Sequence, residues 1–350
     1  MREIKYESKC YGEIEVKIGK DIFKEITSKL EGNKFFITSN KLKEILKIEE
    51  NPLFTLPDGE DAKDISNVLR IISWLRENGA SREDYLISIG GGSVLDTAGF
   101  SASIYMRGMN LVYVPTTLLS MVDASIGGKV AVNFSEIKNI IGSFYPAKLI
   151  VNDIKMLESN SRREILSGIA EVLKYGFIMD KKLLDFVATN RNRIFQFDEE
   201  VLEQIIYRSD EDKITIVRQD EMEKKGVRSI LNFGHTIGHA IESHSSFTIP
   251  HGLAISVGMV YETIICVKKG LCNNSTLLKI KSTLNDFGLP TSLKDIGLNL
   301  DLETAFKYIM ADKKRSGNMI RLPIIKEIGE WELIRLPLGE FKELIRDVLL

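Results

Sequence analysis

The chain has 350 residues, which is enough for two domains that each bury a core. Hydrophobic residues make up 44% of it and charged residues 27%, as in globular proteins, and the formal net charge of −2 argues against a general basic surface for nucleic acid. The three cysteines are widely spaced and form no CxxC pattern, which argues against a disulfide framework and against a thiolate metal site.

No N-terminal signal pattern is visible, and we judge the longest apolar runs too short to span a bilayer. We therefore expect a cytoplasmic protein with no membrane attachment and no nucleic-acid partner. An anionic small molecule can still be bound by local lysines and arginines.

The first half of the sequence alternates β-rich runs with helical ones. In residues 64–77 the apolar side chains of Ile65, Val68, Leu69, Ile72 and Leu75 share one helical face. Strands are expected at residues 13–18, 34–38, 85–89, 111–114 and 148–151. Strands alternating with helices at this spacing predict a parallel sheet covered by helices.

After about Asp153 the pattern becomes mostly helical. Helices are expected at residues 163–179, 201–217, 236–244 and 253–269, the last ended by Gly270. The sequence therefore predicts an α/β fold, with a Rossmann-like parallel-sheet domain in residues 1–157 and a mostly α-helical domain in residues 158–350.

A glycine-rich loop follows the strand that ends at Ile89. Residues 90–96 read Gly-Gly-Gly-Ser-Val-Leu-Asp, and a helix is expected from about Ser93. Glycines allow backbone N–H groups to approach phosphate, and the helix N-terminus favours negative charge, so the loop is suited to a dinucleotide pyrophosphate. The loop is not GxGxxG, and a tight turn that merely needs glycine is the alternative.

Two other segments favour a nucleotide at the same edge of the sheet. The acidic turn at residues 58–63 is suited to ribose hydroxyls, and Pro115-Thr116-Thr117 follows the strand at residues 111–114. Each could be only a solvated loop, but three such segments at one edge are harder to dismiss.

All four histidines lie between residues 235 and 251. His235 and His239 are four apart and share one face of a helix, and His251 follows Pro250 at the start of the next one. Imidazole is a common metal ligand, and Glu171 in an otherwise apolar helix could supply a further ligand. The alternatives are a surface ion pair between Glu171 and Lys174 and a packed core imidazole for His239, whereas we interpret His244 as a surface residue.

Residues 123–133, with Lys138, Asn139 and Gly142, place cations and amides on glycine-containing loops. Such loops are suited to a phosphorylated substrate, although each lysine taken singly is an ordinary surface residue.

Over nearly its whole length, the chain resembles the family of 3-dehydroquinate synthase, which is the second enzyme of the shikimate pathway. The motifs run in the family's order: DGEDAK at 58–63, GGGSVLD at 90–96, RG at 107–108, PTT at 115–117, VDASIGGKVAVN at 122–133, KNIIGSF at 138–144, SGIAEVLKYG at 167–176, RSILNFGHTIGHAIE at 228–242 and HG at 251–252. The resemblance implies conversion of 3-deoxy-arabino-heptulosonate 7-phosphate to 3-dehydroquinate and phosphate. It also implies bound NAD, one divalent ion (zinc or cobalt), a homodimer, and an active site in the cleft between a nucleotide-binding and a helical domain.

The same resemblance assigns roles to individual residues. The metal ligands would be Glu171, His235 and His251. The NAD-binding residues would be Asp58, Gly59, Glu60, Asp61, Ala62, Lys63, Gly91, Gly92, Ser93, Val94, Leu95, Asp96, Thr116, Thr117, Lys129, Lys138, Met156, Leu157, Glu158 and Ser159. The substrate would contact Asp123, Lys129, Asn139, Lys174, Lys213, Arg228, Asn232 and His239, with Arg107 reaching the partner subunit's site.

Two departures from the family pattern affect these assignments. One extra residue lies in the segment from Glu223 to Val227, which makes Lys213 a less certain match than Arg228. Near the C-terminus, Arg321 stands close to where the family has a phosphate-binding lysine.

Three other functions remain open from the sequence. A metal- and NAD-dependent polyol dehydrogenase would share the glycine loop and the histidines but would have no use for the clustered lysines. A cyclase acting on another sugar phosphate would not need Arg228 for a carboxylate. A non-enzymatic metal- or nucleotide-binding module would not need these acid, base and cation positions.

Overall fold

The computed structural model describes residues 1–134, 137–312 and 318–349. Contacts divide the chain into two compact units, residues 1–161 with 193–222 and residues 162–192 with 223–350. The sequence predicted a single division between residues 157 and 158. In the structure, the first stretch of the first unit extends to residue 161, and residues 193–222 also belong to that unit.

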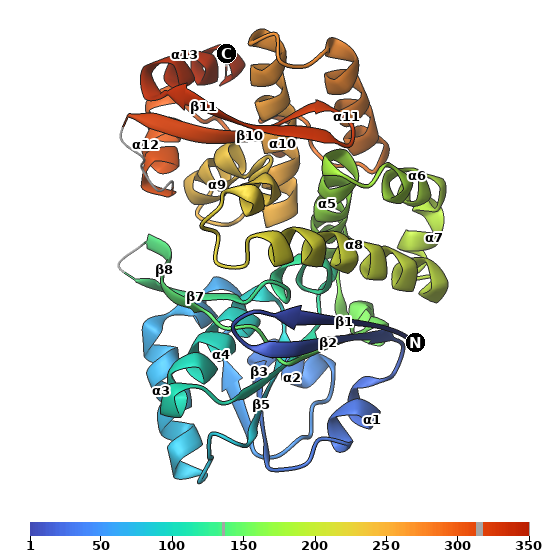
Figure 1. Cartoon of the computed structure of the whole chain (residues 1–350), viewed down its shortest axis with the longest axis vertical. Helices are drawn as coiled ribbons and strands as arrows, with labels where there is room; N and C mark the ends of the chain where they lie inside the picture. The colour runs from blue at the N-terminus through green and yellow to red at the C-terminus, as the bar shows by residue number, and fades with distance from the viewer. Residues whose placement is uncertain (135–136, 313–317, 350) are drawn as a thin grey trace. The chain divides into compact units, whose positions relative to one another are not determined.

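The first unit is built on a seven-stranded sheet with the order β1-β2-β9-β6-β5-β3-β4, of which β1, β2, β3 and β5 are labelled in Figure 1. Its strands are β1 (Arg2–Ser8), β2 (Gly12–Gly19), β3 (Lys34–Ser39), β4 (Leu53–Leu56), β5 (Tyr85–Gly90), β6 (Asn110–Pro115) and β9 (Leu149–Asp153). β1 and β2 pair antiparallel, whereas the other neighbours are parallel. The five expected strands are confirmed, and the sequence analysis missed β1 and β4.

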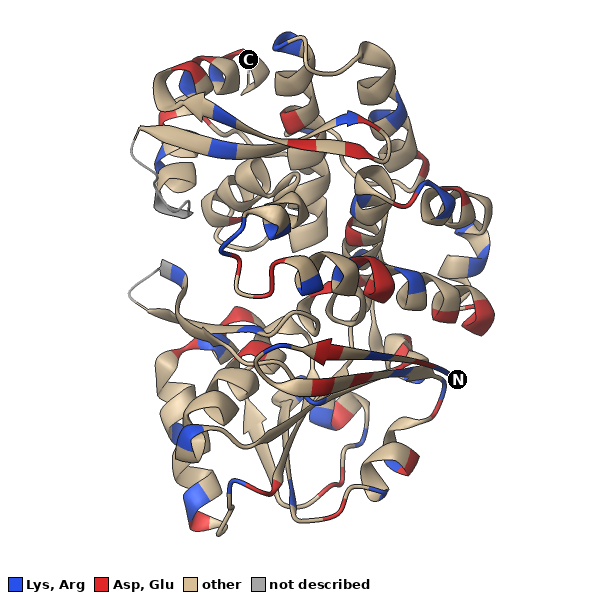
Figure 2. Ribbon diagram, viewed as in Figure 1, with Lys and Arg blue, Asp and Glu red and all other residues tan. Residues whose placement is uncertain are grey.

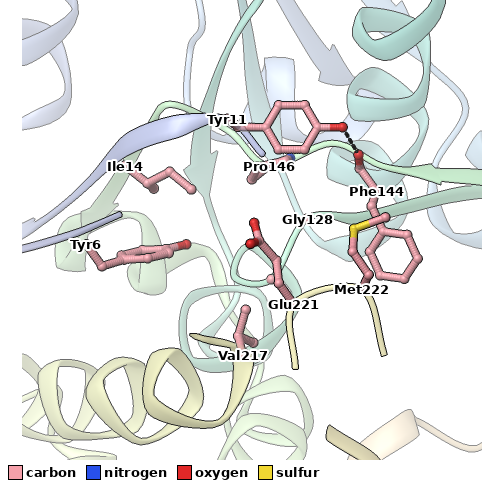
Figure 3. A pocket seen from close by; sticks show the side chains of 10 residues that line it. Tyr6, Tyr11, Ile14, Gly128, Phe144, Pro146, Val217, Glu221 and Met222 are labelled. Carbon is pink, nitrogen blue, oxygen red and sulfur yellow. Dashed lines mark hydrogen bonds between the residues drawn. The ribbon is translucent and has the colours of Figure 1, made fainter. Parts of the chain in front are cut away.

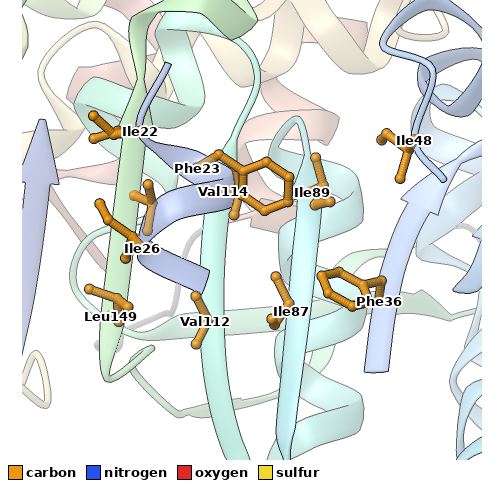
Figure 4. Packing of buried hydrophobic residues seen from close by; sticks show 11 residues of the cluster. Ile22, Phe23, Ile26, Phe36, Ile48, Ile87, Ile89, Val112, Val114 and Leu149 are labelled. Carbon is orange, nitrogen blue, oxygen red and sulfur yellow. The ribbon is translucent and has the colours of Figure 1, made fainter. Parts of the chain in front are cut away.

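Helices cover both faces of this sheet. Ile87 and Ile89 of β5 pack with Val112 and Val114 of β6 and with Phe23 at the start of α1 (Figure 4). α4 covers the other face of the sheet. It approaches β6 so closely that a Cβ on Gly99 would lie 2.1 Å from Tyr113 Oη. The helical and turn elements of the unit are α1 (Phe23–Ser28), α2 (Asn40–Ile45), η1 (Gly59–Lys63), α3 (Ile65–Glu77), α4 (Gly92–Ile104), η2 (Tyr105–Arg107), η3 (Ser120–Ala124), η4 (Ile154–Ser159) and α8 (Glu199–Gln219); α7 (Arg191–Phe195) lies where the division falls.

The apolar face of α3 differs from its expected composition in two positions. Val68 and Leu75 are fully buried as expected, but Leu69 is 60% exposed, and Ile71, which was not expected on this face, is fully buried. Leu69 follows Val68 by one residue, which rotates it by roughly 100° away from the buried stripe. A hairpin of β7 (Lys129–Phe134) and β8 (Ile137–Phe144) packs its Val130 and Val132 near this helix.

The second unit is mostly helical. It contains α5 (Arg162–Ile178), α6 (Lys181–Thr189), η5 (Val227–Asn232), α9 (His235–His244), α10 (His251–Lys268), α11 (Asn274–Asp286), η6 (Lys294–Ile296), α12 (Leu302–Asp312), β10 (Met319–Glu327), β11 (Glu330–Pro337) and α13 (Leu338–Leu349). The expected helices are confirmed in both units, together with the α/β fold class. The antiparallel hairpin of β10 and β11 was not predicted.

The composition of α10 is close to that of a membrane-spanning helix. α10 has 18 residues and a mean hydropathy of 1.2, so it is long and apolar enough to cross a membrane, which the sequence analysis did not expect of any segment. However, 72% of that stretch is buried inside the chain, and the helix carries the fully buried Glu262. This is the pattern of a core helix.

Charged residues of both signs are interspersed over the described chain (Figure 2).

Candidate functional site

The glycine loop joins the carboxyl end of β5 to the start of α4. Gly90 pairs with Pro115 of β6, and Gly91 caps α4 in an extended conformation. A Cβ on Gly90 would lie 2.5 Å from the Cβ of Val94, so packing alone requires this glycine. At Gly91 and Gly92 a Cβ would meet nothing closer than 3.4 Å. The tight-turn alternative therefore explains Gly90, whereas the other two glycines leave room beside the N–H groups of the first turn of α4.

Two threonines follow β6 at the same edge. Thr116 is fully buried, and its hydroxyl oxygen has no hydrogen-bond partner among the residues described here. The Thr117 hydroxyl instead contacts Ser120 Oγ at 2.8 Å. Since buried hydroxyls are nearly always hydrogen-bonded, the Thr116 hydroxyl indicates a ligand or a water molecule at this edge. Asn160, which was not predicted, donates from Nδ2 to Thr116 O at 2.6 Å.

The acidic turn lies against the start of α4, and part of it has a structural role. Glu60 accepts from Asn133 Nδ2 at 2.8 Å and lies 3.6 Å from Lys138 Nζ. Asp58 accepts from the Lys41 N–H at 3.0 Å. These carboxylates tie the turn to the hairpin of β7 and β8 and to α2, whereas Asp61 is exposed.

Lys63 is the buried cation of this turn. It is 5% exposed, and its Nζ lies 2.5 Å from Asp96 Oδ2 and also contacts Asn139 Oδ1. Burial raises the pKa of Asp96, an effect that the Lys63 ammonium opposes. The structure thus brings three expected site residues from separate segments together.

A second ion pair, between a buried lysine and a partly buried aspartate, joins Asp123 to α8. Lys213 is 5% exposed, and its Nζ lies 2.7 Å from Asp123 Oδ1 and also contacts the Asp123 carbonyl. Burial raises the pKa of the neighbouring Asp210 well above its usual range. Lys213, the less certain of the matches, therefore lies with another expected substrate residue.

Other expected residues of the first unit lie outside these two clusters. Lys129 and Arg107 are exposed, the latter on a turn where Met106 and Arg107 have φ of 48° and 65°. In η4, Leu157 is buried and Met156 packs against the sheet core, while Ser159 Oγ donates to Met156 O. A separate cavity of about 10 Å³ is lined by Tyr6, Tyr11, Phe144 and others and has room for one water molecule. None of the expected site residues lines it (Figure 3).

In the second unit, the three expected metal ligands converge. His235 and His251 are the first residues of α9 and α10, and Glu171 lies within α5 and is fully buried. Glu171 Oε1 lies 3.4 Å from His251 Nε2 and 3.8 Å from His235 Nε2. A tetrahedral ion with bonds of ~2.1 Å separates its ligands by roughly 3.4 Å, so this spacing and donor set fit one divalent ion.

Glycines allow the three helices to approach at this point. A Cβ on Gly252 would lie 2.1 Å from Ser167 O, and the Gly252 N–H donates to Ser167 Oγ at 2.8 Å. A Cβ on Gly258 would lie 1.9 Å from Gly234 O. α10 therefore touches α5 one turn before Glu171 and touches the residue that precedes α9. The backbone contacts bring the ligands together.

Lys174 and Glu171 form a buried ion pair. Lys174 Nζ contacts Glu171 Oε2, and the two side chains are 1% and 0% exposed. The surface-pair alternative is therefore wrong. Breaking a buried pair is costly, so this lysine is held beside the carboxylate.

The two imidazoles have different electrostatic environments. Burial, with a contribution from Lys174, lowers the pKa of His235 well below its usual range, and its Nδ1 donates to Phe233 O at 3.1 Å. This assigns the tautomer in which Nε2 carries a lone pair. Burial also lowers the pKa of His251, but the Glu242 and Glu171 carboxylates raise it to about 10.

The sequence analysis missed Glu242, although it follows His239 by three residues on the same helix. Its Oε2 lies 3.2 Å from His251 Nδ1 and 3.9 Å from His239 Nε2. His239, Glu242 and His251 thus form a second set that could hold an ion. The His239 side chain is 34% exposed, so it is not the buried core imidazole of the alternative interpretation.

The remaining expected substrate residues precede α9 on η5. Arg228 is 3% exposed, and Asn232 is partly buried. Arg321 is exposed on β10 near Gly226, since its Nη1 lies 4.0 Å from the Cβ that a side chain there would have.

Comparisons with known proteins indicate the family of the chain. Residues 53–167 match the N-terminal region of 3-dehydroquinate synthase, and residues 168–315 match its C-terminal region. A 3-dehydroquinate synthase of Sulfurisphaera tokodaii is 43% identical over 96% of both chains, and one of Saccharolobus solfataricus is 43% identical over 98% of both.

Solved structures give the same fold. A 2-deoxy-scyllo-inosose synthase in complex with carbaglucose-6-phosphate, NAD+ and Co2+ has a TM-score of 0.87 and 25% identity, covering 99% of this chain and all of that one. A probable glycerol dehydrogenase of Sinorhizobium meliloti, at a TM-score of 0.69, 15% identity and 95% coverage of both chains, shares the fold alone. From the family match over residues 53–315 and the two relatives at 43% identity, the chain belongs to the 3-dehydroquinate synthase family.

Proposed function

We propose that this protein is a lyase that converts 3-deoxy-arabino-heptulosonate 7-phosphate into 3-dehydroquinate and inorganic phosphate. The observation that carries the proposal is the buried cluster in which Glu171 Oε1 lies 3.4 Å and 3.8 Å from the Nε2 atoms of two imidazoles while Lys174 contacts its other oxygen. A carboxylate and two imidazoles form the ligand set of many catalytic zinc sites. The family membership specifies the substrate.

The reaction eliminates phosphate, closes a carbocycle by an intramolecular aldol step and leaves the substrate without net oxidation or reduction. When bound, NAD supplies a hydride acceptor that is restored within each turnover, and a divalent ion supplies a Lewis acid for the substrate hydroxyls. The protein has to hold both groups, bind the substrate's two anionic ends and move protons.

In the second unit, Glu171, His235 and His251 would hold the ion. Lys174, whose ammonium contacts the Glu171 carboxylate, would orient a ring hydroxyl and pass a proton at Nζ. Arg228, which is nearly buried just before α9, would pair with the substrate carboxylate. Asn232 and His239 would bind its phosphate.

In the first unit, the N-terminus of α4 would bind the pyrophosphate of NAD, and the Thr116 hydroxyl would find its partner on the nucleotide. Lys129 and Asn139 would bind the substrate phosphate, while the pair of Asp123 and Lys213 would orient ring hydroxyls and support the carboxylate.

We also propose that the protein is a cytoplasmic homodimer in which Arg107 reaches the partner subunit's site. Arg107 is exposed on its turn, as this role requires. Light scattering should give twice the mass of the chain, and Arg107→Ala should lower turnover while leaving metal binding unchanged.

One assay tests the proposed function directly. The purified protein is incubated with the heptulosonate phosphate, NAD and Zn2+ or Co2+, with and without a chelator. Phosphate release that stops on chelation, with no accumulation of NADH, is the expected result. Accumulation of NADH without phosphate release would instead identify a dehydrogenase and refute the proposal.

A further inference from the structure

A fully buried carboxylate lies at the N-terminus of α9 and is not explained by the mechanism above. Glu262 belongs to α10, and its Oε2 accepts from the Gly234 N–H at 2.8 Å. Its Oε1 accepts from the N–H groups of Thr236 at 2.9 Å and Ile237 at 3.3 Å. These donors lie on both sides of His235, the first residue of α9.

A second carboxylate acts in the opposite direction. Glu242 belongs to α9, and its side chain is 8% exposed. Its Oε2 accepts from His251 Nδ1 at 3.2 Å, and His251 is the first residue of α10. Glu262 of α10 therefore lies at the start of α9, where His235 is the first residue, and Glu242 of α9 lies at the start of α10, where His251 is the first residue.

We propose that Glu262 and Glu242 are positioning residues that hold the two imidazoles in the geometry that the divalent ion requires. This inference rests on the proposed function, because it takes Glu171, His235 and His251 as the ligands.

The role of Glu262 follows from the chemistry of helix ends. The first N–H groups of a helix have no acceptor within it, and the local dipole favours negative charge. In most helices a side chain just before the helix supplies the acceptor, but α9 is capped by Gly234, which has no side chain. Glu262 provides the acceptors from the neighbouring helix, and Gly258, one turn earlier, permits the close approach to Gly234. The backbone of His235 is thereby fixed relative to α10.

The role of Glu242 follows from the two nitrogens of His251. The Nε2 atom lies on the side of Glu171, at 3.4 Å, whereas Nδ1 donates to Glu242. A carboxylate on the second nitrogen fixes the tautomer and the ring orientation of a metal-binding histidine, and its loss typically weakens metal binding by about 10- to 100-fold. This geometry assigns Glu242 to orientation of the ring and not to direct ligation.

The test is metal affinity, measured on the full-length protein by competition with a chromogenic chelator for Zn2+ and by the visible absorption of bound Co2+. We expect Glu262→Gln and Glu242→Gln each to weaken Zn2+ binding by roughly 10- to 100-fold and to change the Co2+ bands. The amide keeps the size of the side chain but removes the negative charge that faces the histidine or the helix N-terminus. At Glu262, whose two oxygens both accept from backbone N–H groups, it also places an NH2 group where an acceptor is needed. Asp295→Asn is the matched control, because Asp295 accepts from the N–H groups of Thr291 and Ser292 in a loop of the same unit that carries no ligand.

The outcomes separate this inference from the proposed function. A Glu262→Gln variant with a lower melting temperature but unchanged affinity and Co2+ spectrum would show a purely structural role and overturn the inference for that residue. If that variant does not fold, Glu242→Gln provides the test, and unchanged affinity there would overturn the inference. Unchanged metal affinity in His235→Ala would refute the ligand set itself, and with it the proposed function.

Discussion

Gly252→Ala is expected to damage the metal site without changing any ligand. Gly252 follows His251 in the first turn of α10, and its backbone lies against Ser167, one turn before Glu171. A Cβ there would lie 2.1 Å from Ser167 O and 2.5 Å from Ser167 Cα. Both atoms belong to the backbone, so no side-chain rotation can relieve the clash.

The size of the effect follows from these distances. To reach the 3.4 Å of ordinary contact, the Cβ must move by more than 1 Å away from Ser167 O, and the start of α10 must move with it. Overpacking of this kind costs about 2 kcal/mol of stability. Metal–ligand distances tolerate shifts of only about 0.2 Å, so the displacement of His251 should weaken metal binding by at least tenfold.

The assay combines thermal unfolding of the metal-free protein with Zn2+ competition. Gly339→Ala is the control, since Gly339 also lies in the first turn of a helix of this unit and its Cβ would meet nothing within 4 Å. The control should be neutral or slightly stabilising. A Gly252→Ala protein with wild-type stability and metal affinity would show that this backbone contact does not set the position of His251.

Three further predictions concern other residues. Lys174→Met should destabilise the metal-free protein by roughly 3 kcal/mol because the Glu171 carboxylate stays buried, and Zn2+ should reduce that loss of melting temperature; an equal loss with and without Zn2+ would contradict this. Gly92→Ala should leave folding unchanged, since its Cβ meets nothing closer than 3.5 Å, but should weaken NAD binding in calorimetry; unchanged affinity would place the pyrophosphate elsewhere. The Thr291 and Ser292 N–H groups lower the pKa of Asp295, so the stability it contributes is present at neutral pH and lost as pH falls through that lowered pKa. The melting temperatures of Asp295→Asn and the wild type should therefore differ at pH 7, and the difference should start to shrink near pH 3.8 and vanish only below the lowered pKa; a constant difference would refute the linkage.

Periodicity predicted the elements that position the site. The alternating strands and the 3.6-residue helices of α5, α9 and α10 follow from local patterns of apolar residues. The hairpin of β10 and β11 was missed because Pro323 interrupts the pattern of the first strand, and the alternation of the second breaks where Leu333 and Ile334 follow each other. Helical periodicity also cannot tell which unit a helix joins, so the grouping of residues 193–222 with the first unit was not predicted.

The residues of the proposed metal site were easier to find in the sequence than the residues that support them. The histidines stood out because all four lie between residues 235 and 251, and the motif match specified Glu171. Glu262 was invisible because its role depends on the backbone of another helix, which no spacing along α10 reveals. The burial of Lys174 likewise depends on the packing around α5, and its sequence spacing suits a surface pair equally well.

The central claim is that Glu171, His235 and His251 hold one divalent ion. Anomalous diffraction from crystals grown with Zn2+ locates such an ion without reference to activity. One peak about 2.0–2.2 Å from a Glu171 carboxylate oxygen and from the Nε2 atoms of both histidines is the expected result. A peak among His239, Glu242 and His251, the second set that the structure offers, or no peak at either place, would contradict the account.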